Sequence, residues 1–245
     1  MELIIAYKTV RTYIFWFIIT SIFLPICLLL ALLPKTIRYD NRLYFLCTAL
    51  WNRLMLFFVF VHIRVEGEEN IPVYPNNPSI IVSNHTSALD IMIIDSLLGD
   101  YPRVWLVKNE YGKIPFFGKL LKQMHVLVER DNPRKAIEAL INAIALVKDK
   151  DRHLVIFPEG TRSKDGKIGE FLDGFAFAAS KTQRRVIPFF IENAQKVCPS
   201  DSNFIDPRAA TIKVRIGKPF EMLENEDRIS FKNRIKEWFL QEQNT

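Results

Sequence analysis

The 245-residue sequence predicts an α/β fold: a mixed, mostly parallel sheet flanked by helices and preceded by an N-terminal helical membrane hairpin. Three observations predict it. Short apolar runs of strand length alternate with runs of helical periodicity after residue 61. Polar turns follow two of these runs, at the strand ends where open α/β sheets bind ligands. The first quarter is instead almost uniformly apolar. We therefore divide the chain into membrane-anchoring helices over residues 1–61 and an α/β domain over residues 62–245.

Two apolar stretches in the N-terminal quarter are long enough to enter a membrane. Thr12–Leu33 carries no charge, and roughly 20 apolar residues suffice to cross the hydrocarbon core as a helix. Tyr44–Val61 is interrupted by Asn52 and Arg53, and an arginine at mid-helix costs about 3 kcal/mol in lipid. The pair is therefore either a hairpin that dips into one leaflet or one span followed by an interfacial helix. A signal peptide is disfavoured, because the run is too long and no small-residue cleavage site follows it.

From residue 60 on, the local pattern of apolar and polar residues predicts the strands and helices. Strands are expected at Phe60–Glu66, Ser79–Ser83, Arg103–Val107, Met124–Val128, His153–Phe157, Val186–Ile191 and Thr211–Ile216. Helices are expected at Leu89–Leu98, Phe116–Gln123, Pro133–Lys148, Asp173–Ser180 and Ser230–Gln241. The third of these helices has the clearest signal, since Asn132 and Pro133 open it and apolar residues recur at helical spacing.

Composition and charge exclude several classes of protein. With 49% hydrophobic residues and only 9 Gly and 13 Pro, the chain is neither disordered nor collagen-like. Three cysteines without CxxC or Cys/His spacing predict reduced thiols, no metal site and no tightly bound cofactor. The net charge of +6 divides into +4 on residues 1–61 and +2 on residues 62–245. That distribution suits anionic lipid headgroups near the anchor and argues against a nucleic-acid partner.

The first candidate site is the segment Asn84–Asp90, directly after a predicted strand. A histidine at a strand end and an aspartate five residues later can form a dyad. Asp90 would then orient the ring of His85 and leave its other nitrogen free as a general base. The alternative is helix capping, with Ser87 or Asn84 as N-cap and Asp90 in the first turn. The spacing alone leaves both interpretations open.

The second candidate site is the segment Phe157–Ser163, which also follows a predicted strand. It offers backbone N–H groups, a hydroxyl, a carboxylate and the guanidinium of Arg162. Such a set suits a phosphate, because guanidinium binds oxyanions through paired hydrogen bonds. A polar surface turn with a glycine is the alternative.

Taken together, the two segments resemble the 1-acylglycerol-3-phosphate acyltransferase family. NHTSALD matches its NHx4D block and FPEGTRS its block of the same sequence. Two further blocks occur in the family's order: Lys108–Gly118, continued by Val126–Arg130, and Val186–Phe189 after FPEGTRS. The resemblance covers roughly residues 60 to 220, and an N-terminal membrane hairpin is similar to bacterial members.

The resemblance implies transfer of a fatty acyl group to the free hydroxyl of lysophosphatidic acid, giving phosphatidic acid. The donor would be acyl-CoA or acyl-carrier protein. By motif match, His85 is the general base and Asp90 its partner. The acceptor's glycerol phosphate would be bound by Glu159, Gly160, Thr161 and Arg162, with Lys108 as a further contact.

Other functions fit less well. A different lysophospholipid or an amino-acid-derived lyso-lipid remains an alternative acceptor. A serine hydrolase is disfavoured because no GxSxG is present, and a non-enzymatic adaptor because His85 and Asp90 are both intact. Both donors are cytosolic, and the compact motif spacing looks bacterial. We therefore expect the catalytic domain on the cytoplasmic side of a bacterial inner membrane.

Overall fold

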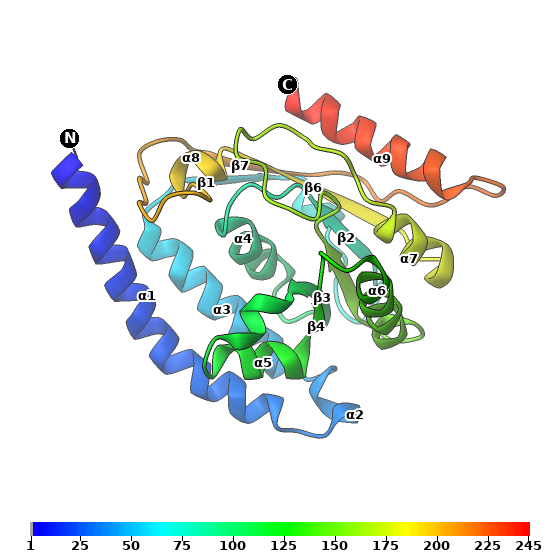
Figure 1. Cartoon of the computed structure of the whole chain (residues 1–245), viewed down its shortest axis with the longest axis horizontal. Coiled ribbons are helices and arrows are strands. Elements are labelled where there is room, and N and C mark those ends of the chain that lie inside the picture. Colours follow the sequence, from blue (N-terminus) through cyan, green and yellow to red (C-terminus); the bar gives the residue numbers. More distant parts are fainter. Residues whose placement is uncertain (1) are drawn as a thin grey trace.

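The structure is a computed structural model that describes residues 2–245 (Figure 1). Its described part contains a seven-stranded sheet in the order β1-β7-β6-β2-β5-β3-β4. Every neighbouring pair is parallel except β6 and β7, which confirms the predicted mixed, mostly parallel sheet. The strands are β1 (Ile63–Glu66), β2 (Ile80–Ser83), β3 (Arg103–Lys108), β4 (Val126–Val128), β5 (His153–Ile156), β6 (Val186–Glu192) and β7 (Ile212–Ile216).

Helices cover both faces of the sheet. They are α1 (Glu2–Ala31), α2 (Lys35–Arg38), α3 (Arg42–Val59), α4 (Leu89–Leu98), α5 (Phe117–Met124), α6 (Pro133–Val147), α7 (Gly174–Thr182), α8 (Ala194–Val197) and α9 (Arg228–Gln243), with the short 3₁₀ helices η1 (Glu68–Asn70) and η2 (Asn109–Lys113). Figure 1 shows α3 and α4 on one side of the central strands and α6, α7 and α9 on the other. The central strands are therefore covered on both faces, which is why they read as continuous apolar runs.

The alternation along β2 divides the core into two layers. Ile81 packs with the α3–α4 layer, whereas Ile80 and Val82 face the layer that contains residues of α6, α7 and α9. Because successive side chains of a strand point to opposite faces, the four-residue β2 anchors both layers at once. The next residues of the chain, starting at Asn84, leave the sheet at its buried centre.

The predicted elements are present, with shifts at their ends. The strand expected from Phe60 begins at Ile63, because Phe60 has a positive φ of 61° and ends α3. The strand expected from Met124 begins at Val126, because Met124 closes α5. The short helices α2, α8, η1 and η2 were not predicted, since three to five residues carry too little periodicity to be recognised.

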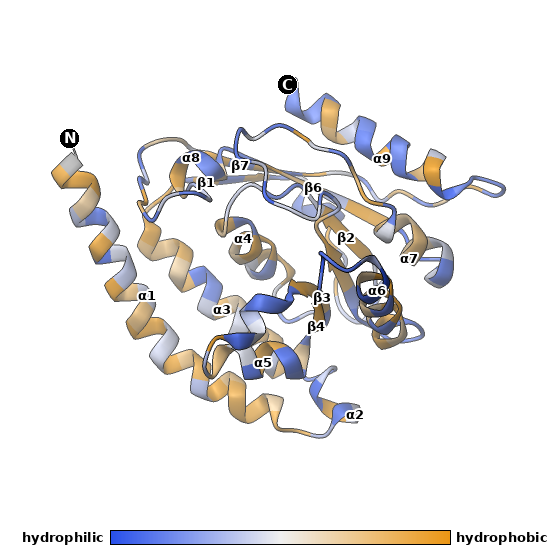
Figure 2. Ribbon diagram, in the orientation of Figure 1, coloured by the Kyte–Doolittle hydropathy of each residue, from blue (hydrophilic) through white to orange (hydrophobic). Residues whose placement is uncertain are grey.

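The two N-terminal helices pack against the rest of the protein along one side. Ile19, Cys27 and Ala31 of α1 belong to a buried cluster that also contains residues of α3 and α5. The opposite side of α1 is exposed and apolar along nearly its whole length (Figure 2). Both helices are long and apolar enough to cross a membrane by length and composition. Each has only one apolar face free, however, because the other face is used by the protein core.

A buried ion pair joins α3 to the sheet. The guanidinium of Arg103 on β3 is fully buried and donates to Asp95 on α4 over 2.6 Å. Asn52 of α3 donates to the same carboxylate over 2.9 Å, and Thr48 of α3 accepts from Arg103 over 3.2 Å. The polar residue that interrupts the second apolar stretch therefore points inward, to a buried charge.

Candidate active site

The loop from Asn84 to Ala88 brings His85 and Asp90 together between β2 and α4. The Nδ1 atom of His85 lies 2.9 Å from Oδ2 of Asp90, and both side chains are buried. The same oxygen accepts the backbone N–H groups of Thr86 over 2.6 Å and Ser87 over 2.8 Å. Asp90 therefore holds the ring and the turn that presents it.

These contacts define the tautomer of His85. A carboxylate can only accept hydrogen bonds, so Nδ1 carries the proton that it shares with Asp90. The Nε2 atom is then an unprotonated acceptor, and Nε of Arg162 donates to it over 3.4 Å. The ring thus has its basic nitrogen directed toward the second candidate segment.

Capping and dyad formation coexist here. The N-cap of α4 is Ala88, whose side chain makes no cap bond. Ser87 instead accepts the N–H of Leu89 over 3.2 Å through its hydroxyl, which donates to the carbonyl of Cys198 over 2.7 Å. Asp90 satisfies backbone donors just before the helix while it contacts His85. The two interpretations of this segment are therefore not exclusive.

Two further contacts fix the position of the loop. Asn84 exchanges a pair of 2.8 Å hydrogen bonds with the backbone of Ile191 on β6. The ring of Phe157, at the end of β5, stacks on His85 with centroids 3.9 Å apart. The imidazole is therefore held by a carboxylate on one edge and an aromatic face below, which leaves little rotamer freedom.

Glu159 ties the second segment to the first. One of its carboxylate oxygens accepts the N–H of His85 over 3.2 Å, and the other accepts the N–H of Gly169 over 3.1 Å. Ser163 adds a backbone bond of 2.8 Å to the carbonyl of His85. Burial raises the pKa of Glu159 above its ordinary value, although the two N–H bonds favour the charged form. The carboxylate of Glu159 therefore joins the loop at His85 to the segment that follows β5 through hydrogen bonds.

The rest of the second segment lies open beside the histidine. Gly160 has a φ of +70°, a conformation that favours glycine, and its carbonyl accepts from Arg130 at the end of β4. Thr161 is exposed. Arg162 reaches between His85 and the hydroxyl of Tyr111, to which its Nη2 donates over 3.1 Å. The predicted block thus contributes a free hydroxyl, a glycine turn and one guanidinium.

Lys108 stands apart from this cluster. It ends β3 and is half-exposed, and its Nζ lies 3.4 Å from Glu110. Within residues 2–245, its only ion pair is with Glu110, and it has no hydrogen bond to His85 or Arg162. Sequence reasoning gave no role to Phe157, Arg130 or Tyr111 individually. All three lie in the matched blocks or directly at their ends, which is the only signal that could have found them.

A cavity of about 670 Å³ borders the second segment. Phe157, Glu159, Gly160 and Thr161 line one side of it, together with Arg130. Its remaining walls are mostly apolar. They come from the strands, from α6, from α7 and from the loop before α7, among them Leu106, Val128, Ile156, Ile137, Leu140, Leu172, Phe175 and Phe177. Because Phe157 also stacks on His85, one aromatic ring separates this cavity from the imidazole.

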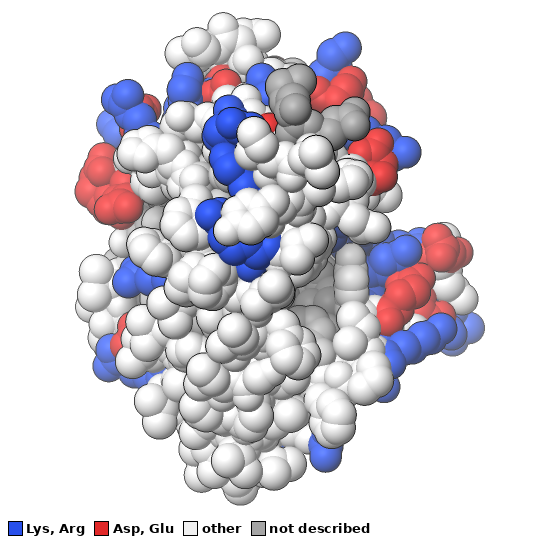
Figure 3. Space-filling model, turned by 90° about the vertical axis from the view of Figure 1, so that its left-hand side faces the viewer, with Lys and Arg blue, Asp and Glu red and all other residues white. Residues whose placement is uncertain are grey.

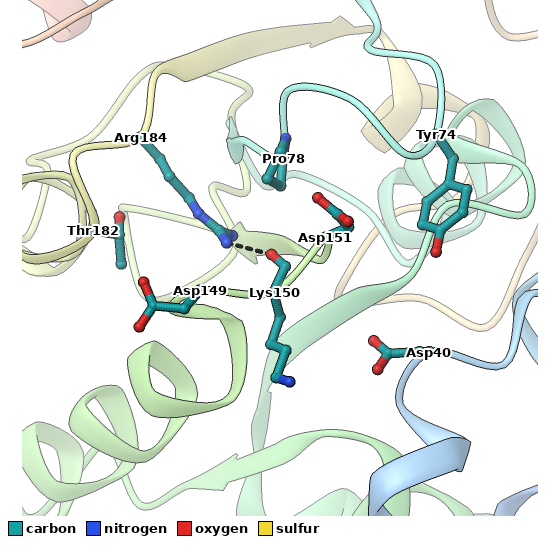
Figure 4. Close-up of a pocket in the computed structure, with 8 residues that line it drawn as sticks. All are labelled: Asp40, Tyr74, Pro78, Asp149, Lys150, Asp151, Thr182 and Arg184. Carbon is teal, nitrogen blue, oxygen red and sulfur yellow. Dashed lines mark hydrogen bonds between the residues drawn. The ribbon is translucent and has the colours of Figure 1, made fainter.

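A second cavity, of about 560 Å³, lies at the opposite edge of the sheet (Figure 4). It is lined by Asp40, Asp149 and Asp151 together with Arg184, whose guanidinium donates to the carbonyl of Lys150. Asp149 and Asp151 precede β5 and Arg184 precedes β6, whereas His85 follows the carboxyl end of β2. The part of the chain that the structure describes has no group of three or more His, Cys, Asp or Glu side chains arranged to hold a metal ion.

Comparison with known proteins supports the family resemblance that these sequence blocks indicate. The family model described as "Acyltransferase" matches residues 62–192. The 1-acyl-sn-glycerol-3-phosphate acyltransferase LPAT1 of Arabidopsis thaliana chloroplasts is 33% identical over 182 residues, which are 74% of this chain and 49% of that protein. A 1-acyl-sn-glycerol-3-phosphate acyltransferase of Helicobacter pylori strain J99 is 36% identical over 133 residues, covering 53% of this chain and 54% of that protein. The chain thus spans about half the length of these curated relatives.

A solved structure has the same fold. The crystal structure of the 1-acyl-sn-glycerophosphate acyltransferase PlsC from Thermotoga maritima superimposes with a TM-score of 0.77 at 22% sequence identity. The match covers 96% of each chain, including the N-terminal helices. At this identity, the likeness establishes the fold alone.

Proposed function

The chain belongs to the acyltransferase family, among relatives named 1-acyl-sn-glycerol-3-phosphate acyltransferases, and we propose that it acylates lysophosphatidic acid at a membrane surface. The donor is acyl-CoA or acyl-carrier protein, and the product is phosphatidic acid. The observation that carries this proposal is the 3.4 Å separation between Nε2 of His85 and the guanidinium of Arg162. A base and a phosphate-binding cation are then neighbours, as an acceptor with both a hydroxyl and a phosphate requires.

The proposed reaction needs one base and no covalent enzyme intermediate. Nε2 of His85 takes the proton from the acceptor hydroxyl, and the hydroxyl oxygen attacks the thioester carbonyl carbon. A carbon–oxygen bond forms, the carbon–sulfur bond breaks, and the imidazolium returns its proton to the departing thiolate. Asp90 stabilises the transient imidazolium, because its carboxylate already holds Nδ1–H over 2.9 Å.

The acceptor phosphate is proposed to bind at Arg162, beside the turn at Gly160 and Thr161. Arg162 would exchange its contact with Nε2 for a phosphate oxygen, which also frees the basic nitrogen. Glu159 contributes by holding the two loops together, since both of its oxygens already accept backbone N–H groups. Lys108 supplies a further positive charge at the edge of the site.

The apolar cavity beside Phe157 is the proposed position of the donor's acyl chain. Its walls are mostly aliphatic and aromatic, and each CH₂ group that they cover contributes about 0.8 kcal/mol. A chain in this cavity would bring its carbonyl end next to Phe157 and therefore next to His85.

We further propose that α1 and α3 lie in one leaflet of the membrane. The lower half of the face over α1 is nearly free of charged side chains, whereas Lys and Arg form a patch in the centre of its upper half and others lie at its edges (Figure 3). Arg53 is exposed at the middle of α3, a position that is inexpensive at headgroup level and costly at the bilayer centre. A full crossing by α1 would also draw α3 and α5 into the hydrocarbon, because all three share one core. Since both donors are cytosolic, we place the enzyme on the cytoplasmic side of a bacterial inner membrane.

The test is product analysis with purified protein. A panel of lysophospholipids is offered with acyl-CoA and with acyl-carrier protein, and the lipids formed are identified by mass spectrometry. Product from lysophosphatidic acid alone is the expected result. Product from other headgroups at similar rates would contradict the acceptor assignment, and a His85→Ala variant that works at the wild-type rate would contradict the base.

Arg162→Gln adds a test of headgroup binding. We expect the KM for lysophosphatidic acid to rise at least tenfold, because a charge-assisted contact to phosphate is lost. An unchanged KM would show that Arg162 does not bind the acceptor.

A further inference from the structure

The loop between η2 and α5 exposes large apolar side chains from the catalytic domain itself. Phe116 is 70% exposed and Ile114 is 44% exposed, with Pro115 between them also at the surface. Phe116 has a φ of +59°, which is unusual for a bulky residue and has a conformational cost. An aromatic ring that is exposed to water on a strained backbone is unfavourable in free energy. The arrangement therefore points to an apolar partner that covers the ring.

The loop is firmly built. The N–H of Gly118 donates to the carbonyl of Ile114 over 2.7 Å, and the N–H of Leu120 donates to the carbonyl of Phe116 over 3.1 Å. Gly118 approaches η2 so closely that a Cβ there would lie 2.4 Å from the carbonyl oxygen of Gly112. Phe116 is therefore presented to the outside by a fixed turn rather than by a loose segment.

The loop continues the apolar surface formed by the N-terminal helices. The ring of Phe117, the first residue of α5, contacts Trp51 of α3 edge to face with centroids 6.3 Å apart. Leu120 and Met124 of α5 share a buried cluster with α1 and α3. In Figure 1 the turn into α5 lies beside α1, and Figure 2 shows both segments as apolar. Whatever covers the free face of α1 is therefore adjacent to Phe116.

The charges around the loop define the chemistry of that surface. Residues 109–122 contain three lysines, Lys113, Lys119 and Lys122, and one acid, Glu110. All three lysines are exposed, and Glu110 pairs with Lys108 over 3.4 Å. Exposed apolar side chains ringed by lysine match a bilayer surface with anionic headgroups.

We propose that Ile114 and Phe116 insert into an anionic membrane surface, with Lys113, Lys119 and Lys122 bound to its headgroups. This inference rests on the proposed membrane-bound function. It adds that the α/β domain also contacts the lipid surface next to the site, through a loop that continues the apolar surface of the two N-terminal helices. Tyr111, in the 3₁₀ helix that leads into the loop, contacts Arg162. The inserted loop thereby places the phosphate-binding arginine at headgroup height, where a lysolipid presents its phosphate.

Phe116→Asp tests the proposal, with Leu223→Asp as its matched control. Leu223 is 62% exposed and lies in the segment between β7 and α9, away from α1. Each enzyme is assayed on lysophosphatidic acid in phosphatidylcholine vesicles with 30% phosphatidylglycerol, and on a short-chain lysophosphatidic acid that is monomeric in solution. We expect Phe116→Asp to lose about tenfold or more in rate on vesicles and to keep its rate on the soluble acceptor. Leu223→Asp should keep both rates.

The possible outcomes distinguish the loop's role in membrane contact from the proposed acyltransferase function. Equal vesicle rates for Phe116→Asp and wild type would overturn the loop's role and leave the acyltransferase proposal intact. An equal loss on both acceptors would also overturn it, because Phe116 would then act on the site or the fold. Wild type without product on either acceptor would instead refute the proposed function.

Two further measurements address lipid contact directly. Phe116→Trp should add fluorescence that brominated lipid quenches, whereas Leu223→Trp should add fluorescence that it does not quench. Lys113→Gln combined with Lys119→Gln and Lys122→Gln should reduce binding to vesicles with phosphatidylglycerol and leave binding to pure phosphatidylcholine unchanged. Equal loss on both vesicles would contradict the headgroup contact.

Discussion

Replacing Asp90 by asparagine removes the negative charge beside His85 while it keeps the size and shape of the side chain. The amide oxygen can take the place of Oδ2 and accept from Thr86, Ser87 and Nδ1 of His85. The amide NH₂ would take the place of Oδ1, which is buried and has no hydrogen-bond partner. The turn and the tautomer can therefore survive, while the negative charge beside the imidazolium is lost.

The size of the effect follows from that charge. Two unit charges about 4 Å apart at an effective dielectric constant of about 20 interact by about 4 kcal/mol. Part of this is retained, because the amide oxygen still accepts the Nδ1–H bond. A loss of about 3 kcal/mol from transition-state stabilisation lowers kcat by roughly 10²-fold, and the full 4 kcal/mol by roughly 10³-fold.

The assay follows release of free thiol from acyl-CoA with saturating lysophosphatidic acid, alongside thermal unfolding. Asp90→Asn should stay folded but unfold below the wild-type temperature, because three charge-assisted hydrogen bonds become neutral ones and the amide NH₂ is buried without an acceptor. Asp100→Asn is the matched control: Asp100 pairs with Arg42 at the surface, where the pair contributes little to stability. A folded Asp90→Asn enzyme with kcat within threefold of wild type would refute the dyad.

Three stability predictions concern the scaffold, each measured by thermal or urea unfolding. Gly118→Ala should destabilise the protein by about 1–3 kcal/mol, because the new Cβ meets backbone 2.4 Å away; unchanged unfolding would show that this approach can relax. Arg103→Met should cost about 3–5 kcal/mol by leaving the buried Asp95 unpaired, and adding Asp95→Leu should restore part of that loss. Burial lowers the pKa of His153 to about 3, partly opposed by its bond to Ser79, so unfolded His153 binds a proton that the folded form rejects. This contribution of His153 to stability is complete above pH 6.5 and is lost by about 1.4 kcal/mol per pH unit toward pH 3. His153→Phe should remove it and keep the similar contribution of His125, whose pKa burial lowers to about 4.

Most of the sheet could be predicted because the physical rule behind each strand is local. The runs at Ser79–Ser83 and His153–Phe157 are buried on both faces, and that environment leaves a continuous apolar signature. These apolar runs do not indicate the order of the strands in the sheet. The neighbours of β2 are β5 and β6, which lie more than 65 residues away in the chain. Which strand pairs with which depends on how two layers of helices pack, and no local pattern records that.

The candidate site could be predicted only as far as its motifs are contiguous. His85 and Asp90 fall within one segment, so their contact is nearly local. The hydrogen bond from the N–H of His85 to Glu159 joins residues 74 positions apart, and no local pattern in the sequence indicates it. The contact of Tyr111 could not be predicted for the same reason. Its hydroxyl accepts a hydrogen bond from Arg162 over 3.1 Å only because the fold brings the two residues together.

The buried polar network of α3 connects the two halves of the molecule. In the sequence, Asn52 stood beside Arg53 as an interruption of the second apolar stretch. In the structure it donates to Asp95, which binds Arg103 of β3, so α3 is fastened to the sheet by a charge that cannot be left unpaired. Helix α4, which carries Asp95, also carries Asp90 five residues earlier, and Asp90 orients His85. If α3 lies in the membrane surface, its depth therefore sets the height of His85 above the lipid. The proposed catalytic base is then held at a fixed distance from the bilayer by a chain of buried contacts rather than by a flexible segment.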